Sequence, residues 1–305
     1  MAEIIESKIE STPYEKMLPE GVGLVLEGGG ARTYYSAGVF EAFMDAGIMF
    51  RHIVGVSAGI ANALSYVSGQ KGRNRVIAEK FVQQKAYCGK RNFLKNGSLF
   101  NWDYIFREIP ERLLYWDIEA FEKVDTRFLA GTVDCITGES VWFDKKDIIN
   151  KPGLLPIKAS CSLPLIARIV KHEGRKLLDG GLKTPISIEK SIEDGNNFHV
   201  IVLTNNPGFK SKRFKRADLI KPLYRNYPKL VDIIMNRHEA YNKQLALCEQ
   251  LEREGKAIIL RPQRPMDVTI LERDPQKLLR LYDEGHADGA KAVKLIEEHV
   301  ATQGL

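Results

Sequence analysis

The sequence contains few cysteines and no cluster of residues with the spacing of metal ligands. Its 305 residues include only four cysteines, which are scattered, with no CxxC pair and no zinc-type histidine spacing. They are Cys88, Cys135, Cys161 and Cys248. This usage is typical of free thiols in a reducing compartment, and it gives no reason to expect a metal or a cofactor.

Features that would carry the chain into or through a membrane are also missing. No apolar stretch approaches the length of a membrane span. Residues 1–20 have mixed charge and lack the apolar region of a signal peptide. We therefore expect a cytoplasmic protein. Peripheral association with a membrane surface stays open.

The sequence lacks the patterns that accompany nucleic-acid binding. Its net charge is +6, but no zinc finger, helix-turn-helix or RNA-binding aromatic motif accompanies that charge. We therefore do not expect nucleic acid as a partner. Basic residues concentrate at 209–216, Phe-Lys-Ser-Lys-Arg-Phe-Lys-Arg. Two interpretations stay open for this segment: a solvated loop, or a contact with an anionic membrane surface.

Residues 53–59, Ile-Val-Gly-Val-Ser-Ala-Gly, are the segment around which the chain is organised. Apolar residues lead into Ser57, with Gly55 two positions before it and Gly59 two positions after it. A small-residue, helix-favouring run follows at 60–64, so the pattern predicts a strand, a sharp turn and a helix. The glycines permit the strained turn because a nearby Cβ would clash, and the helix N-terminus favours negative charge at the serine.

A second strand, turn and helix are predicted at 23–43, with Gly28, Gly29 and Gly30 in the turn. Consecutive glycines let backbone N–H groups face a bound oxygen, as in a phosphate cradle or an oxyanion hole. The phosphate loop needs a lysine that does not follow here, and the dinucleotide motif needs glycine where Thr33 stands. The sequence therefore matches neither of these nucleotide-binding motifs.

A serine nucleophile needs a base, because its free hydroxyl attacks poorly at neutral pH. No histidine stands in a late loop after a strand, where a Ser–Asp–His order would place it. The histidines are His52, His172, His199, His238, His286 and His299. Asp179 is the stronger candidate, since it ends a predicted strand and is followed by Gly180 and Gly181. A turn or cap role for Asp179, and a histidine-assisted esterase, remain the alternatives.

Strands and helices alternate along the rest of the chain. We expect hairpins at 127–143 and 167–178, strands at 199–204 and 257–260, and helices at 229–254 and 276–300. The segment 79–121 is rich in aromatic residues, a subset of which we expect to line an acyl-chain groove. No tract is linker-like or repeated, which favours one domain around a largely parallel sheet.

The expected organisation follows from these elements. It comprises an N-terminal extension at 1–20 and a single domain at 21–305, with a motif-bearing core at 22–204 and a C-terminal helical extension at 210–305.

Three motifs in this order resemble those of the patatin-like phospholipases: Gly-Gly-Gly-Ala-Arg at 28–32, Gly-Val-Ser-Ala-Gly at 55–59 and Asp-Gly-Gly at 179–181. Smaller matches at 65–70 and 159–164 resemble a bacterial branch of that family. The resemblance covers about 22–204 and implies a three-layer α/β/α fold with a largely parallel central sheet. The sequence departs from the family pattern at Thr33, where many members have glycine, and after Gly181, where Asn-Pro or Asp-Pro is common.

The resemblance also implies a Ser–Asp dyad without histidine, with Ser57 as nucleophile and Asp179 as base. The backbone amides of Gly28, Gly29, Gly30 and Ala58 would form the oxyanion hole. Supporting motif positions are Arg32, which we expect to steady the glycine loop, and Gly55, Gly59, Gly180 and Gly181.

The function implied is that of a serine acyl hydrolase acting on fatty acyl esters of lipids. Phospholipase A, lysophospholipase and general esterase activities all stay open, because motif spacing does not report the shape of the groove. The alternative is a lipid-binding or regulatory protein that keeps the fold but hydrolyses little.

Overall fold

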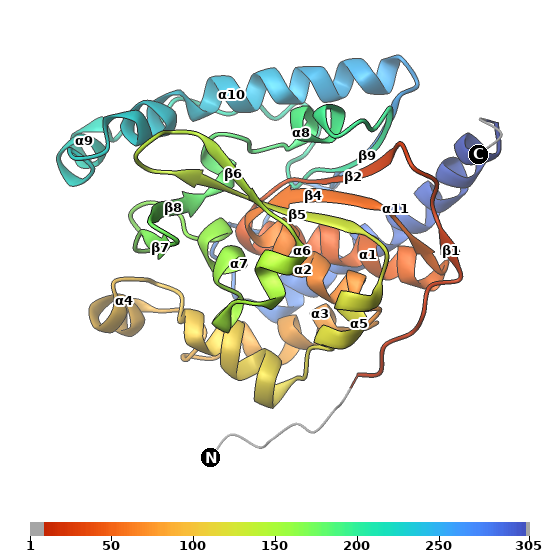
Figure 1. Cartoon of the computed structure of the whole chain (residues 1–305), viewed down its shortest axis with the longest axis horizontal. Helices are drawn as coiled ribbons and strands as arrows, with labels where there is room; N and C mark the ends of the chain where they lie inside the picture. Colours follow the sequence, from red (N-terminus) through yellow and green to blue (C-terminus); the bar gives the residue numbers. More distant parts are fainter. Residues whose placement is uncertain (1–8, 303–305) are drawn as a thin grey trace.

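The computed structural model describes residues 9–302. It shows a central sheet with helices on both faces (Figure 1). The strand order is β10-β9-β2-β4-β5-β8-β7, and β6 pairs with β5. These strands are β2 (Val22–Leu26), β4 (His52–Val56), β5 (Arg127–Asp134), β6 (Ser140–Phe143), β7 (Val170–His172), β8 (Arg175–Asp179), β9 (Phe198–Val202) and β10 (Ala257–Leu260). Strands from β10 to β5 run parallel, and the pairs of β5 with β6 and β8, and of β7 with β8, are antiparallel. The predicted α/β fold with a largely parallel sheet is confirmed.

Alternate residues of the parallel strands face two different cores. Leu24 and Val200 point into one core, whereas their neighbours Val25 and Ile201 point into the other. Strands buried on both faces carry continuous apolar runs, as these do. The first core includes α1 (Tyr34–Asp45), α2 (Ser57–Val67) and α11 (Pro275–Thr302), and the second includes α8 (Ile188–Glu193) and α10 (Pro228–Arg253). The molecule therefore has three layers.

The remaining helical segments are short. They are α3 (Arg73–Val76), η2 (Ile77–Phe81), α4 (Lys90–Asn96), η3 (Tyr104–Leu113), α5 (Ile118–Lys123), α6 (Lys145–Ile149), α7 (Leu155–Ser160) and α9 (Ala217–Leu223), with 3-10 turns η1 (Gly30–Thr33), η4 (Pro152–Leu154) and η5 (Gly180–Leu182). The short parallel strands β1 (Lys16–Met17) and β3 (Ile48–Met49) form a separate pair. Both predicted hairpins are confirmed as β5–β6 and β7–β8, although the second begins three residues later, at Val170.

The C-terminal part of the chain shares the sheet and core of the motif-bearing part. Strand β10 pairs with β9, and α11 packs along α1. We propose on this ground that the core and its C-terminal extension form one domain. Part of the expected N-terminal extension, residues 1–8, lies outside the described residues. None of the helices within 9–302 is long and apolar enough to cross a membrane, and the cytoplasmic location stays a prediction.

Helices α1 and α11 approach closely because glycines lie at their contact. A Cβ atom at Gly38 would collide with the carbonyl oxygen of Tyr282. A Cβ atom at Gly285 would collide with the carbonyl oxygen of Tyr35. The two backbones can therefore touch only where both side chains are absent, and this contact holds α11 against the first core.

Replacing Gly285 with alanine should destabilise the protein. The gain of about 1 kcal/mol in helix propensity is outweighed by overpacking, which typically costs about 1–3 kcal/mol. We expect the midpoint of thermal unfolding to fall by several degrees. The control is Gly89→Ala, because no atom lies within 4 Å of a Cβ built there. Equal midpoints for the two variants would contradict this packing.

Candidate active site

Ser57 lies at the corner between β4 and α2, in the strand–turn–helix that its motif predicts. Its φ of 56° falls in the left-handed region, which non-glycine residues rarely adopt. The flanking glycines allow this turn. A Cβ at Gly59 would collide with the carbonyl oxygen of Glu27, and one at Gly55 would lie 2.7 Å from Leu26 Cβ. The strain is characteristic of functional sites.

Ser160, at the end of α7, holds the backbone of the serine corner. Its hydroxyl accepts a hydrogen bond from the Ser57 N–H at 2.8 Å and donates one to the Gly131 carbonyl at 2.7 Å. The Ser57 amide is thus occupied. Ser160 belongs to the 159–164 match noted in the sequence, but nothing there indicated this role.

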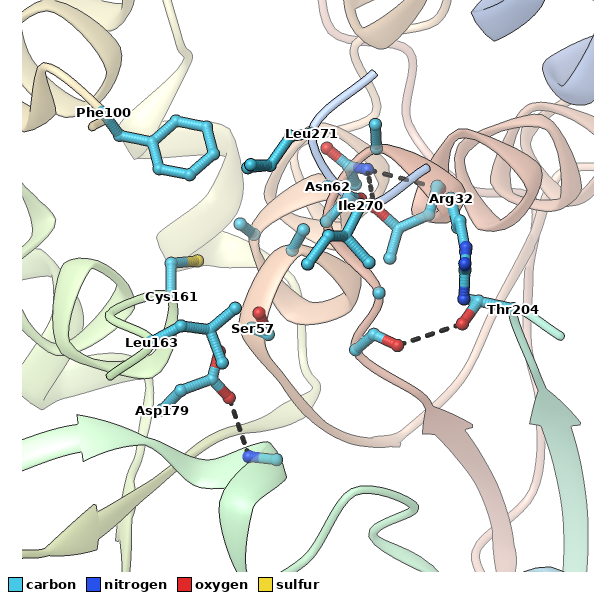
Figure 2. Close-up of a pocket in the computed structure, with 18 of the residues that line it drawn as sticks. Arg32, Ser57, Asn62, Phe100, Cys161, Leu163, Asp179, Thr204, Ile270 and Leu271 are labelled. Atoms are coloured by element: carbon cyan, nitrogen blue, oxygen red, sulfur yellow. Dashed lines mark hydrogen bonds between the residues drawn. The ribbon is translucent and has the colours of Figure 1, made fainter. Parts of the chain in front are cut away.

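Asp179 ends β8, and its carboxylate points toward Ser57 (Figure 2). Its Oδ1 accepts from the Gly181 N–H at 2.7 Å, and its buried Oδ2 has no hydrogen-bond partner among the described residues. Burial raises the pKa of Asp179 to about 6, while the Ser57 hydroxyl, the Gly181 amide and the Arg237 charge each lower it. The Ser57 hydroxyl therefore lies near the carboxylate, although their geometry falls short of a formed hydrogen bond. Such contacts commonly tighten when substrate binds.

The glycine loop presents free amides beside the serine. The N–H groups of Gly28, Gly29 and Gly30, and that of Ala58, donate to no other group within residues 9–302. A Cβ at Gly28 would lie 2.8 Å from Ser57 Cβ, which shows how closely the loop approaches. Free amides in this position can stabilise negative charge that develops on an acyl oxygen.

Buried Glu27 ties the glycine loop to the end of β9. Its Oε2 accepts from the Thr204 N–H at 2.6 Å, and its Oε1 accepts from Asn205 Nδ2 at 3.0 Å. The Thr204 hydroxyl in turn donates to the Gly28 carbonyl at 3.0 Å (Figure 2). Burial raises the pKa of Glu27, and its hydrogen bonds lower it. The sequence identified the loop but not this anchor.

Arg32 makes its contacts on the outer side of the glycine loop. Its Nε donates to the Val268 carbonyl at 3.0 Å, and its Nη1 donates to Asn205 Oδ1 at 2.9 Å. The neighbouring Ala31 N–H donates to the Ile270 carbonyl at 3.0 Å. These hydrogen bonds attach the segment 268–270 to the glycine loop, and Arg32 contributes one of them.

Arg237, on α10, is a cation on the cavity wall whose charge acts on Asp179. Its Nε donates to the Gly181 carbonyl at 2.7 Å, and the Gly181 N–H donates to Asp179. Its positive charge lowers the pKa of Asp179 and of Glu27. No sequence pattern predicted Arg237, because its contact joins positions 56 residues apart in the chain.

A cavity of about 570 Å³ contains Ser57, Asp179 and the glycine loop. This volume lies within the usual range for small-molecule sites. The aromatic residues on its wall from the segment 79–121 are Tyr87, Phe100, Trp102, Phe106 and Trp116. Another part of the wall carries Phe209, Lys212, Phe214, Arg237 and His238. The cavity wall is thus rich in aromatic residues from the segment 79–121, and it carries cations both beside that segment, at Arg73 and Arg273, and at Lys212 and Arg237.

Among the described residues, no histidine is hydrogen-bonded to Ser57 as a Ser–His–Asp site would require. Of the six, His238 lines the cavity, and no hydrogen bond joins it to Ser57 in the described structure. His52 contacts Asp194 at 2.9 Å, and His199 contacts Ser191 at 3.0 Å, both at the opposite ends of their strands from the dyad. Within residues 9–302, no His, Cys, Asp and Glu side chains gather in a group that could hold a metal ion.

Comparison with known proteins gives relatives of limited similarity. The chain is 26% identical over 192 residues to "Uncharacterized protein YjjU" of Escherichia coli strain K12, covering 61% of this chain and 52% of that protein. It is 25% identical over 165 residues to "Uncharacterized NTE family protein Rv1063c" of Mycobacterium tuberculosis, covering 54% of this chain and 44% of that protein. The chain thus spans about half the length of the curated relatives it matches.

One solved structure, VipD from Legionella pneumophila, covers 96% of this chain at 14% identity, with 70% of that chain covered and a TM-score of 0.45. A family model described as "Domain of unknown function (DUF6363)" matches residues 227–300. A model described as "Patatin-like phospholipase" matches residues 24–189, more than half of the 305 residues. The protein therefore belongs to the patatin-like phospholipase family.

Proposed function

We propose that this protein is a serine acyl hydrolase that cleaves fatty acyl esters of lipids through Ser57 and Asp179. Family membership supports lipid acyl hydrolase activity in general. The observation that carries the specific proposal is the buried Asp179 carboxylate. It points toward the strained Ser57, and one of its oxygens has no hydrogen-bond partner among residues 9–302. The free amides of the glycine loop complete the arrangement.

In the first half of the proposed reaction, Ser57 Oγ attacks the acyl carbonyl carbon and its proton passes to Asp179. The carbonyl electrons move onto the oxygen, which the amides of residues 28–30 and Ala58 stabilise. The intermediate collapses, the bond to the alcohol breaks, and the alcohol leaves with the proton from Asp179. An acyl-serine ester remains on Ser57.

Water releases the acyl group in the second half. Asp179 takes a proton from water as the oxygen attacks the acyl-serine, and it returns that proton to Ser57 Oγ as the ester bond breaks. A pKa of about 6 suits this exchange, since the carboxylate is ionised at neutral pH and is a stronger base than an exposed aspartate. The fatty acid then leaves, and no metal or cofactor takes part in these steps.

The cavity wall fits a lipid ester with one apolar and one polar end. The aromatic side chains of the segment 79–121 supply an apolar surface for an acyl chain. Residues 209–216 carry Lys212 and Phe214 on the cavity wall, and we place the peripheral contact with an anionic membrane surface there. Substrate thus enters the cavity from the lipid surface in this proposal.

Replacing Ser57 with alanine should abolish ester hydrolysis, because no other described hydroxyl lies beside both Asp179 and the free amides. We expect the rate on a soluble short-chain acyl ester to fall by at least about a thousandfold, in line with other covalent nucleophiles. Fluorophosphonate should label the unmodified protein at Ser57. Turnover that persists in the alanine variant would refute the mechanism. Folded but unlabelled wild-type protein would favour a lipid-binding protein.

The pH dependence of kcat/KM tests the role of Asp179. A base works only when ionised, so activity should fall as the pH drops through about 6, the pKa of Asp179. In Arg237→Gln a positive charge that lowers this pKa is lost, so the midpoint should move to higher pH. Arg237→Lys keeps the charge and should show a smaller shift. An unchanged midpoint in Arg237→Gln would contradict this assignment.

A further inference from the structure

Two projecting segments expose large apolar side chains to solvent. The first is α4, in which Leu94 is 86% exposed and Phe93 is 41% exposed. The second is the segment 209–223, which contains α9 and exposes Leu223 at 60% and Leu219 at 43%. Exposed apolar residues that gather beside polar residues, rather than being scattered singly, mark candidate protein or membrane contacts.

The same two segments carry a concentration of unpaired positive charge. Helix α4 contains Lys90, Arg91 and Lys95 and no acidic residue. In the second segment, Arg216 pairs with Asp218 at 2.9 Å. Its other basic side chains form no ion pair with any carboxylate among the described residues, and they are Lys210, Lys212, Arg213, Lys215 and Lys221. Basic side chains bind anionic head groups, and neighbouring apolar side chains enter the lipid interface. This combination suits an anionic lipid surface.

A residue just beyond each segment forms a hydrogen bond with the loop at residues 163–168. Beyond α4, the Leu99 N–H donates to the Ile166 carbonyl at 2.8 Å. Beyond α9, the Tyr224 hydroxyl accepts from the Leu165 N–H at 3.1 Å. Figure 1 shows α4 and α9 projecting at the same edge of the molecule, with β7 and β8 between them. The two segments therefore form parts of one surface.

This surface is continuous with the wall of the cavity that holds Ser57. Helix α4 lies between Cys88 and Phe100, which pair by a β-bridge, and both line the cavity. Phe209 and Phe214 also line it and lead directly into α9. The projecting segments are thus continuous with the cavity wall on two sides.

We propose that α4 and residues 209–223 form a two-part docking surface for an anionic lipid bilayer, which places the cavity opening against the bilayer. The proposal deepens the proposed function and rests on it. It goes beyond the basic segment 209–216, since α4 gave no such indication in the sequence. Both parts supply cations for the head groups, and Phe93, Leu94, Leu219 and Leu223 enter the interfacial layer.

Vesicle binding tests the surface without relying on turnover. The protein is the full chain with Ser57→Ala, so that no lipid is consumed. It is sedimented with phosphatidylcholine vesicles that contain or lack about a third of phosphatidylglycerol. We expect binding to the anionic vesicles alone, and a decline as salt rises, because exposed charges are screened.

Substitutions in α4 test separately how its basic residues and its exposed apolar residues contribute to vesicle binding. Lys90→Glu/Arg91→Glu/Lys95→Glu should weaken binding to anionic vesicles at least about tenfold, since each basic residue near such a surface contributes favourably. Phe93→Ser/Leu94→Ser should also weaken it severalfold, and charge reversal at Lys215 and Lys221 should do the same. The matched control is Lys294→Glu/Leu295→Ser on α11, where Leu295 is likewise exposed at 51%. The control should bind within twofold of the parent.

The α4 residues lie outside the cavity wall, so the same variants with Ser57 intact should hydrolyse a soluble ester normally. Normal vesicle binding by both α4 variants would overturn the two-part surface. Equal, salt-insensitive binding to neutral vesicles would overturn the anionic lipid assignment, and binding to neither vesicle would favour an acidic protein partner. Vesicle binding without any soluble-ester turnover in the intact protein would instead refute the hydrolase and leave the surface standing.

Discussion

The left-handed backbone of Ser57 is the constraint on which the site depends. Residues held in such conformations cost of order 1–3 kcal/mol and persist only when their surroundings enforce them. The enforcing contact at Gly59 is with the carbonyl oxygen of Glu27, the residue that begins the glycine loop. Close packing at this point therefore fixes the candidate nucleophile and the free amides relative to one another. The Ser160 hydroxyl completes the restraint by holding the Ser57 amide.

The second constraint is the burial of two carboxylates, which disfavours their ionised forms. A positive charge from the C-terminal part of the chain acts in the opposite direction. Glu27 and Asp179 both have their pKa raised by burial, and Arg237 lowers both. Neither carboxylate forms an ion pair with Arg237 in the described structure, so its charge acts on both at a distance. Arg237 lies outside residues 24–189 and inside 227–300. A residue of α10 thus adds to the electrostatics of the site that the motif-bearing segment forms.

Local patterns predicted the elements of the site, whereas tertiary contacts could not be read from the sequence. The Gly-x-Ser-x-Gly spacing predicted the turn at Ser57, and helical periodicity predicted α10 and α11 closely. The Ser57–Ser160 bond joins positions 103 residues apart, which no local pattern encodes. The sequence predicted no regular element within 79–121, which contains the π-helical segment η3 with Pro110 inside it, so aromatic density alone indicated that this region would line a cavity.

Two parts of the cavity wall connect the proposed dyad with the proposed docking surface. Phe100 and Phe106 supply apolar wall on one side, and Lys212 and Arg237 supply positive charge on another. In the proposed function, a lipid ester with its carbonyl at Ser57 would place its acyl chain against the aromatic residues and its polar part near Lys212 and Arg237. Because α4 is continuous with the first part of the wall and residues 209–223 with the second, a bilayer that contacts both segments would lie next to both parts of the cavity wall. An amphiphilic substrate could then leave the lipid surface with each end already next to the wall that suits it, without exposing its acyl chain to water.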